Sequence, residues 1–470
     1  MANEETFRIP SDVLENAAKH YESFPAILYG GNVWSYSDIR RMVRSLAGAV
    51  MDRFSVKKGD IIGVCLPQSI QGFLSYHALW NNGLVALPID SKMPISAIDT
   101  IVSSGKVSGI ITYEGLYSKI NREDTSSIFN LLTDPKDFLS HFQSPPEDFL
   151  IYKPKGTRQR AVFEEICYGN EMEQEKTDPY TDYAIANIIW KPSGAFSLVK
   201  FTSGAVVESF TREINRIPSR ENSTFLQTYE PSDSSSVVLS YLYPLNFGHT
   251  IAMENLNEGE DLKKATKKLS LDRHIILNVH AYSADFLKDV EKKERDALSL
   301  IFSRGEISEG ILTSLRERKS SVFMFLFDQH SIVPVYIKQS SGAGKFVKFT
   351  EDTEFMGIES RDGRIYIKGS SVVSPDGNEE EITDIKITEN EPEEVISLDQ
   401  DQLILAGKTF PLSHIEKQIS SDLGLKNLKI IQENGVIKLI SNEKIDKKDL
   451  KNILKDHLPP EFSILGSSFT

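Results

Sequence analysis

The segment from Lys200 to Phe210, KFTSGAVVESF, holds the residues of this chain whose types and spacing are best suited to chemistry. Thr202, Ser203 and Gly204 carry a hydroxyl group or lack a Cβ, and they follow the apolar run from Phe196 to Phe201. Residues of these types let a backbone approach phosphate oxygens and donate N–H groups to them. The segment therefore begins like a phosphate-binding loop.

The second half of this segment departs from that pattern. A phosphate loop continues with more Gly, Ser or Thr and then a Lys, whereas this chain continues with Ala205, Val206, Val207 and Glu208. β-Branched residues resist the dihedral angles of a tight anion-binding loop, and the charge of a glutamate repels phosphate. The function depends on whether the remaining half of the loop still binds a nucleotide.

Alternating apolar and amphipathic stretches predict the elements that position this segment. We expect helices at 13–21 and 36–54, capped by Ser11 and Ser37, and further helices at 69–82 and 95–104. Strands are expected at 61–66, 84–89 and 107–112, and the run from Gly30 to Asn32 predicts a β-hairpin. Helices that alternate with apolar strands predict an α/β fold whose parallel sheet is covered on both faces.

Later parts of the chain differ in composition. Residues 142–177 are polar and contain proline, which predicts a surface excursion. Short strands with Gly turns are expected over 336–374, and SGAGK (Ser341 to Lys345) fits a turn between two of them. Carboxylates crowd 376–394, which predicts a solvated loop or linker, although Ile382, Ile385 and Ile387 could form an edge strand. The last segment, 403–470, is expected to hold two strand pairs and two helices in a small α+β domain.

Composition restricts the class of protein. The net charge of −14 argues against nucleic acid and anionic membranes as partners, because both attract basic surfaces. Cys65 and Cys167 lack metal-binding spacing, so we expect two reduced thiols. The N-terminus shows no secretory signal pattern, and no apolar run is long enough to span a bilayer. We therefore expect a cytoplasmic protein without a membrane span.

Three blocks in the N-terminal third resemble the AMP-forming adenylating superfamily, which includes acyl- and aryl-CoA ligases, nonribosomal adenylation domains and luciferases. They are WSYSDIRRMVRSLAGAV (Trp34 to Val50), KKGDIIGVCLPQS (Lys57 to Ser69) and ALWNNGLVALPIDSKMP (Ala78 to Pro94). Further along, DGRIYIKGSSVV (Asp362 to Val373) and LILAGKTFPLSHIEKQI (Leu403 to Ile419) resemble structural motifs of the same family.

This resemblance implies a fold and a reaction. It implies an N-terminal domain over 1–395, built of mostly parallel sheets packed with helices and a distorted β-barrel, and ending in an acidic linker at about 376–395. It also implies a small, mobile, shortened C-terminal α+β domain over 396–470. The implied reaction joins a small-molecule carboxylate and ATP to give an acyl-adenylate and pyrophosphate, followed by transfer to CoA or a carrier thiol.

The nucleotide-binding motifs of the family are only partly present. Its phosphate loop reads TSGTTGxPKG, so the resemblance keeps Thr202, Ser203 and Gly204 as nucleotide contacts and loses the lysine. FDQHS, from Phe327 to Ser331, falls where the family has an aromatic residue that stacks on adenine and a glutamate that binds Mg²⁺. The resemblance therefore implies that Phe327 contacts adenine, while Ser331 replaces the usual metal ligand and no metal-binding residue is assigned.

The substrate pocket that the resemblance implies has two parts. YPLNFGH (Tyr243 to His249) falls at a pocket motif of the family, which implies roles for a set of four residues: Tyr241, Asn246, Gly248 and His249. The family's gating histidine does not align, although His249 is close by. SRGE (Ser303 to Glu306) resembles a turn that shapes the carboxylate and adenine pockets, which implicates Gly305 and Glu306.

Two further motifs of the family lie near the C-terminus. A carboxylate should bind the ribose hydroxyls, and PEEVISLD aligns with that motif and offers Glu394, while Asp384 is the rival. Glu394 has the better spacing to Gly407 and Lys408. A lysine that bridges the substrate carboxylate and ATP should come after the last helix, but the sequence ends at Thr470 before it appears.

Two hypotheses of different classes follow. In the first, the chain is a ligase-like protein that still binds a carboxylate and ATP or AMP, with weak or lost adenylation. In the second, it is a non-catalytic paralogue that acts as a binding or partner subunit. A third alternative is that a partner chain supplies the missing lysine. The first requires nucleotide affinity and the second does not.

Overall fold

The computed structural model describes the chain over a set of segments that covers most of its first half. They are residues 8–120, 129–141, 143–152, 162–190, 195–211, 217, 223–253, 274–280, 287, 298–304, 309–316, 321–326 and 332, and then the strands and short helical segments 336–341, 344–349, 357–361, 364–368, 380–382, 385–388, 391–395, 402–405, 408–411, 416–417, 419–421, 424, 428–433 and 436–441.

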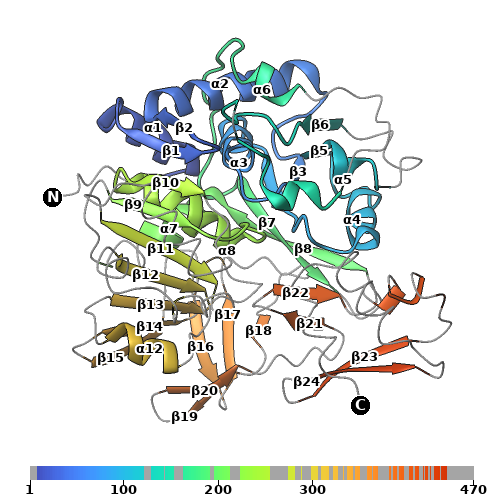
Figure 1. The fold of residues 1–470 in the computed structure, drawn as a ribbon, viewed down its shortest axis with the longest axis vertical. Coiled ribbons are helices and arrows are strands. Elements are labelled where there is room, and N and C mark those ends of the chain that lie inside the picture. The colour runs from blue at the N-terminus through green and yellow to red at the C-terminus, as the bar shows by residue number, and fades with distance from the viewer. Residues whose placement is uncertain are drawn as a thin grey trace.

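Two sheets built mainly of parallel strands form the framework (Figure 1). The first contains nine strands in the order β15-β14-β13-β12-β11-β9-β10-β1-β2, and the strands from β13 to β1 run parallel. Their bounds are β1 Pro25–Tyr29, β2 Asn32–Ser35, β9 Thr224–Gln227, β10 Thr250–Met253, β11 Ile275–His280, β12 Leu298–Arg304, β13 Ser321–Leu326, β14 Tyr336–Ser341 and β15 Gly344–Phe349.

The second sheet contains six strands in the order β6-β5-β3-β4-β7-β8. The first five run parallel, and β8 is antiparallel to β7. Their bounds are β3 Ile61–Cys65, β4 Val85–Pro88, β5 Gly109–Tyr113, β6 Phe129–Thr133, β7 Tyr183–Trp190 and β8 Phe196–Thr202. The predicted α/β class with mostly parallel sheets and covering helices is confirmed.

Helices cover these sheets, and one of them is buried along its whole length. The longer helices are α1 Pro10–His20, α2 Tyr36–Arg53, α3 Ile70–Asn81, α4 Ile95–Val102, α7 Ser203–Thr211 and α12 Glu309–Arg316, and the short ones include α5 Glu114–Tyr117 and α6 Phe163–Ile166. Every residue of α3 is buried, because the helix packs against α1 and α2 on one side and against β3 and β4 on the other. A helix without a charged residue or a separate polar face fits such an interior position.

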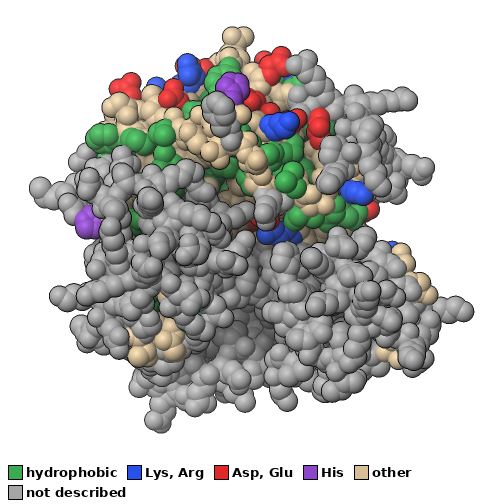
Figure 2. Space-filling view, viewed as in Figure 1, with side chains coloured by type: hydrophobic (Ala, Val, Ile, Leu, Met, Phe, Trp, Pro, Cys, Tyr) green, Lys and Arg blue, Asp and Glu red, His purple; other side chains and the backbone are tan. Residues whose placement is uncertain are grey.

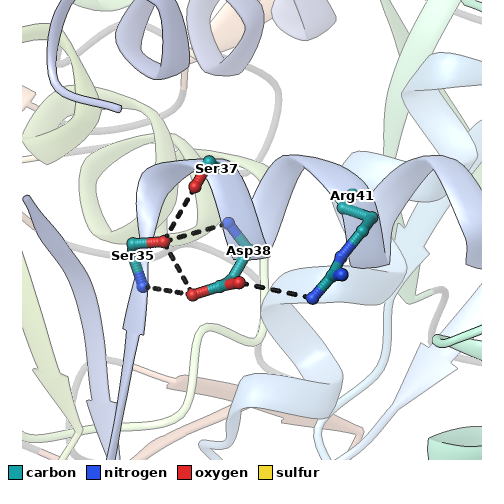
Figure 3. Close-up of polar contacts among 4 residues, drawn as sticks. All are labelled: Ser35, Ser37, Asp38 and Arg41. Carbon is teal, nitrogen blue, oxygen red and sulfur yellow. Dashed lines mark hydrogen bonds and ion pairs between the residues drawn. The ribbon is translucent and has the colours of Figure 1, made fainter. Parts of the chain in front are cut away.

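The N-terminus of α2 corrects a predicted cap. The capping residue is Ser35, not Ser37: Ser35 Oγ accepts from Asp38 N at 3.1 Å, and Asp38 Oδ2 accepts from Ser35 N at 3.2 Å (Figure 3). This reciprocal pair satisfies two backbone donors that the helix itself leaves free. Similarly, Ser11 lies inside α1 rather than capping it, because Pro10 already begins that helix.

Replacement of Ser35 by Ala is expected to destabilise the protein by about 1 kcal/mol, because the cap to Asp38 is lost. Ser37→Ala is the matched control, since Ser37 Oγ contacts only Ser35 Oγ at 3.0 Å in this group. Urea denaturation of both variants measures the difference. Equal losses for the two serines would show that the capping box does not hold the start of α2.

The described residues of the segment 142–177 lie mostly at the surface, as predicted, and a few buried side chains anchor the segment to the core. Phe149 and Phe163 are 1% and 0% exposed, and Cys167 is buried as a free thiol. Phe149 packs edge-to-face on Tyr113 at 5.2 Å. Isolated aromatic residues within a polar stretch fasten it to the sheet, and these long-range contacts are not visible in local composition. The other thiol, Cys65, is also free and buried, as predicted.

Short antiparallel strands fill the later part of the chain, as predicted. SGAGK lies where Ser341 of β14 pairs with Gly344 of β15, which confirms a turn between strands. The remaining pairs are β16 Gly357–Arg361 with β17 Arg364–Lys368, β17 with β18 Glu380–Ile382, β19 Ile385–Thr388 with β20 Glu391–Val395, β21 Gln402–Leu405 with β22 Lys408–Pro411, and β23 Leu428–Glu433 with β24 Val436–Ser441. The barrel and the domain boundaries stay predictions.

The described surface mixes both signs of charge. On the face that Figure 2 shows, Lys and Arg side chains are scattered among Asp and Glu over the upper part of the molecule. No helix within the described residues is long and apolar enough to cross a bilayer.

Candidate nucleotide site and the polar cluster between the sheets

Thr202, Ser203 and Gly204 form a direct junction between a strand and a helix. β8 ends at Thr202 and α7 begins at Ser203, with no loop residue between them. Ser203 N donates to Asp182 O and Gly204 N donates to Pro179 O, both at 2.8 Å. All three residues are buried. The N–H groups of Ser203 and Gly204 that would approach a phosphate are therefore already bonded to carbonyl groups of this chain.

The next donor of α7 is occupied as well. Ala205 N donates to Thr202 Oγ1 at 3.3 Å. The first N–H groups of a helix normally lack partners and form an anion-binding site. Here these N–H groups have partners, so the junction from Thr202 to Ala205, as the structure holds it, does not fit a phosphate group.

The junction also lies at the opposite edge of the sheet from the one that usually binds ligands. Because β8 is antiparallel to β7, Thr202 pairs with Tyr183 at the start of β7. This is the edge formed by the amino ends of the parallel strands. Ligands of open α/β sheets bind outside the carboxyl ends of the strands.

The turn from Asp178 to Asp182 supplies the carbonyl groups that occupy the start of α7. Lys58 Nζ lies 2.6 Å from Asp182 Oδ2 and donates to Lys176 O at 2.7 Å. Asp178 N donates to the same Asp182 Oδ2 at 2.7 Å. Burial raises the pKa of the Asp182 carboxyl, but the hydrogen bonds from Lys58 and from Asp178 N lower it by more, so the pKa lies below its ordinary value.

Tyr241 lies in a π-helical turn beneath α3. The turn Val238–Leu242 joins α8 Ser234–Val237 to α9 Tyr243–Asn246. Tyr241 is 1% exposed and packs edge-to-face on Phe73 at 5.3 Å. Burial, followed by the charge of Glu230, raises the pKa of Tyr241, so its hydroxyl stays protonated. Single π-helical turns are frequent at functional sites.

Asn246, Gly248 and His249 lie where α9 ends and β10 begins, again at the amino edge of the parallel strands. Tyr36 Oη donates to His249 O at 2.7 Å, and His249 is fully buried. Burial lowers the pKa of His249 to about 3, so the imidazole is neutral at physiological pH. The described contacts of Gly248 and His249 fasten α9 to Tyr21 and Tyr36, and a substrate role for this group stays a prediction.

The structure describes only some of the other predicted site residues. Gly305, Glu306, Phe327, Ser331 and Asp384 lie outside the described residues. Glu394 lies in β20, where its backbone pairs with Lys386 of β19. Their roles stay predictions. In the described part of the chain, no group of three or more His, Cys, Asp and Glu side chains could hold a metal ion.

A set of buried polar side chains joins the two sheets at the carboxyl ends of their strands, and we refer to it as the carboxyl-edge cluster. Its members are all 4% exposed or less: Gln68, Ser91, Gln227, Glu230, Ser240 and Asn278. Ser91 N and Ser91 Oγ donate to the two oxygens of Glu230 at 2.7 and 2.8 Å. Gln68 Nε2 donates to Gln227 O. Segments that follow β3 and β4 are thereby bonded to segments at the end of β9.

The cluster also bonds internally within the nine-stranded sheet. Asn278 Nδ2 donates to Gln227 Oε1 and, at 3.3 Å, to Ser240 Oγ from the π-helical turn. Gln227 Nε2 donates to Tyr229 O at 2.7 Å. Burial and then the charges of Glu230 and Asp90 raise the pKa of Cys65, so this thiol stays protonated and is no nucleophile.

This cluster was missed by the sequence analysis, although a signal for it exists. Gln68 follows the apolar strand β3 by three residues, and Ser91 follows β4 by three residues. Polar residues that repeatedly follow apolar parallel strands meet at one edge of a sheet, where ligands bind. The cluster therefore lies at the edge where α/β sheets ordinarily bind ligands, whereas the junction at Thr202 lies at the amino edge.

Comparison with known proteins agrees with this framework. Residues 14–186 match the family model described as AMP-binding enzyme. Enterobactin synthase component F of Escherichia coli K12 is 25% identical over 198 residues, which cover 38% of this chain. Surfactin synthase subunit 1 of Bacillus subtilis is 20% identical over 298 residues, or 55% of this chain. The matched regions span only 15% and 8% of the lengths of these two relatives.

Solved structures match over nearly the whole chain. An o-succinylbenzoate CoA synthetase from Bacillus subtilis superposes with a TM-score of 0.71 at 14% identity, covering 96% of this chain and 93% of that one. An artificially fused adenylation–PCP di-domain from Klebsiella oxytoca gives a TM-score of 0.70 at 14% identity, covering 99% and 94%. At this identity the likeness concerns the fold. Residues 14–186 thus match the family model described as AMP-binding enzyme, and the chain has the fold of adenylate-forming enzymes.

Proposed function

We propose that this chain is a ligase-like protein in which activation of a carboxylate through an acyl-adenylate is weak or lost. The observation that carries the proposal is the junction of β8 and α7, where Ser203 N and Gly204 N bond to Asp182 O and Pro179 O. An adenylating enzyme needs N–H donors and positive charge around the ATP phosphates. Those donors are consumed here, and the charge of Glu208 would repel phosphate.

The second candidate is a non-catalytic paralogue that binds a partner protein. The carboxyl-edge cluster favours it, because Gln227, Asn278 and Ser240 satisfy one another instead of presenting polar atoms to a substrate. One solved neighbour is a fusion of an adenylation domain and a PCP, so a carrier protein is one candidate partner. In the ligase reading, ATP or AMP, Mg²⁺ and CoA or a carrier thiol would take part.

ATP–pyrophosphate exchange with a panel of carboxylates that includes o-succinylbenzoate tests the first proposal. We expect pyrophosphate exchange at the level of the heat-inactivated protein, while calorimetry with Mg-ATP and with AMP should still detect nucleotide binding. The o-succinylbenzoate CoA synthetase of Bacillus subtilis serves as the positive control. Pyrophosphate exchange well above background would overturn the loss of adenylation, and the absence of heat at millimolar nucleotide would remove the ligase-like proposal in favour of the non-catalytic paralogue.

A further inference from the structure

The first N–H groups of α7 are covered by the turn from Asp178 to Asp182, which is itself held by hydrogen bonds and an ion pair. Free N–H groups at the start of a helix carry partial positive charge and attract anions. Two of them, Ser203 N and Gly204 N, bond instead to carbonyl groups of the turn from Asp178 to Asp182. These two bonds connect the turn to the helix start, and their lengths of 2.8 Å are those of good hydrogen bonds.

The turn is a preformed unit. Asp182 N donates to Asp178 O at 3.1 Å, and Asp178 Oδ1 accepts from Tyr180 N at 2.8 Å and from Thr181 N at 3.2 Å. An aspartate that bonds the backbone of the residues after it stabilises such a turn locally. The turn therefore keeps its internal bonds if it pivots away from α7 about the Tyr183–Thr202 pair that follows it.

Lys58 connects this turn to the rest of the protein. Its Nζ bonds to Asp182 Oδ2 and to Lys176 O, on the same segment of chain, while its side-chain stem packs over Gly83. The side chains of Lys58 and Asp182 are 39% and 25% exposed, so the pair is reachable from solvent. The Lys58 amine thus binds the segment 176–182 at both of its ends.

We propose that the turn from Asp178 to Asp182 is a strap over the start of α7, and that the charge of Lys58 keeps this strap closed. When Lys58 is neutral, the ion pair with Asp182 is lost and the strap opens more often, which frees Ser203 N and Gly204 N. Acylation of the lysine amine would remove this charge in the same way. The inference deepens the proposed function, because it names what regulates the closed junction.

Hydrogen–deuterium exchange of the full chain tests the strap directly. In the native protein we expect slow exchange at Ser203 N and Gly204 N, because a helix alone does not protect its first amides. Lys58→Gln should speed exchange at these two amides roughly fivefold, while amides in the middle of α7 keep their rates. Asp182→Asn removes the same pair from the other side and should give the same pattern.

Lys58→Arg is the matched control, since its guanidinium still pairs with Asp182 and should keep the native rates. A thermal melt of each variant separates local opening from a global loss of stability. Unchanged exchange at both amides in Lys58→Gln and Asp182→Asn would overturn the strap. The hydrogen–deuterium measurement does not depend on the nucleotide assays. Measurable ATP–pyrophosphate exchange would contradict the proposed function, whereas only the hydrogen–deuterium rates at the two amides decide whether the strap exists.

Discussion

Replacement of Gly248 by Ala should lower the free energy of unfolding by roughly 2–5 kcal/mol. Gly248 has a φ of +63°, and an added Cβ would lie 2.6 Å from Cε1 of Tyr21. The left-handed backbone alone costs an L-residue about 1–2 kcal/mol, and forcing a methyl group into a packed interior adds about 1–3 kcal/mol. Tyr21 is tied to Tyr36 by ring contact at 5.8 Å, so it has little freedom to move away.

Gly105→Ala is the control for this variant. Gly105 has a similar φ of +71°, but an added Cβ there meets no atom within 4 Å. Its replacement should therefore show only the backbone cost of about 1–2 kcal/mol. Urea denaturation of both variants separates the two contributions. If Gly248→Ala were no worse than Gly105→Ala, the packing of Tyr21 against this turn would be wrong.

Replacement of Glu230 by Ala is the second large effect, with an expected loss of roughly 3 kcal/mol. The carboxylate accepts from Ser91 N and from Ser91 Oγ, and both donors are buried. Removing the acceptor leaves buried donors unsatisfied, at about 1–3 kcal/mol for each group. Because Ser91 follows β4 and Glu230 follows β9, the loss also weakens the attachment of one sheet to the other.

A double-mutant cycle with Ser91→Ala measures how much of that loss belongs to this contact. We expect a coupling energy of about 1 kcal/mol or more, because the two side chains touch. Glu22→Ala, at an exposed glutamate, should change stability by less than about 0.5 kcal/mol. Additive losses for Glu230→Ala and Ser91→Ala would exclude the contact as a link between the sheets.

Local sequence patterns predicted the helices and strands of the N-terminal part well, but they did not identify which side chains contact one another. The helix expected at 69–82 is α3, with Ser69 as its cap and Gly83 in the left-handed region after it, since both signals act within one turn of the chain. The cap of α2 was misplaced by two residues because Ser35 and Ser37 are equally good candidates by type. Only the position of Asp38 relative to Ser35 decides between them.

The sequence predicted which types of residue lie at the candidate site, but not the edge of the sheet at which they lie or the groups to which they bond. Thr202, Ser203 and Gly204 suit a phosphate loop, but the direction of β8 decides which edge of the sheet they reach, and an antiparallel strand reaches the amino edge. The carbonyl partners of their N–H groups come from the turn at 178–182, and nothing in KFTSG indicates them. The pairing within the carboxyl-edge cluster could not be predicted for a similar reason, since Glu230 and Ser91 are 139 positions apart.

The place of the N-terminal hairpin has a consequence for how this chain folds during synthesis. β1 sits between β2 and β10 in the nine-stranded sheet, and Ile27 pairs with Ile251, which follows it by 224 residues. A ribosome that adds about 5–20 residues per second would need roughly 11–45 s to deliver that partner. Until then β1 has an unpaired edge, which is a site for wrong pairing. The region 14–186 that matches the family model lacks β10, so we expect a fragment ending before Met253 to aggregate rather than fold.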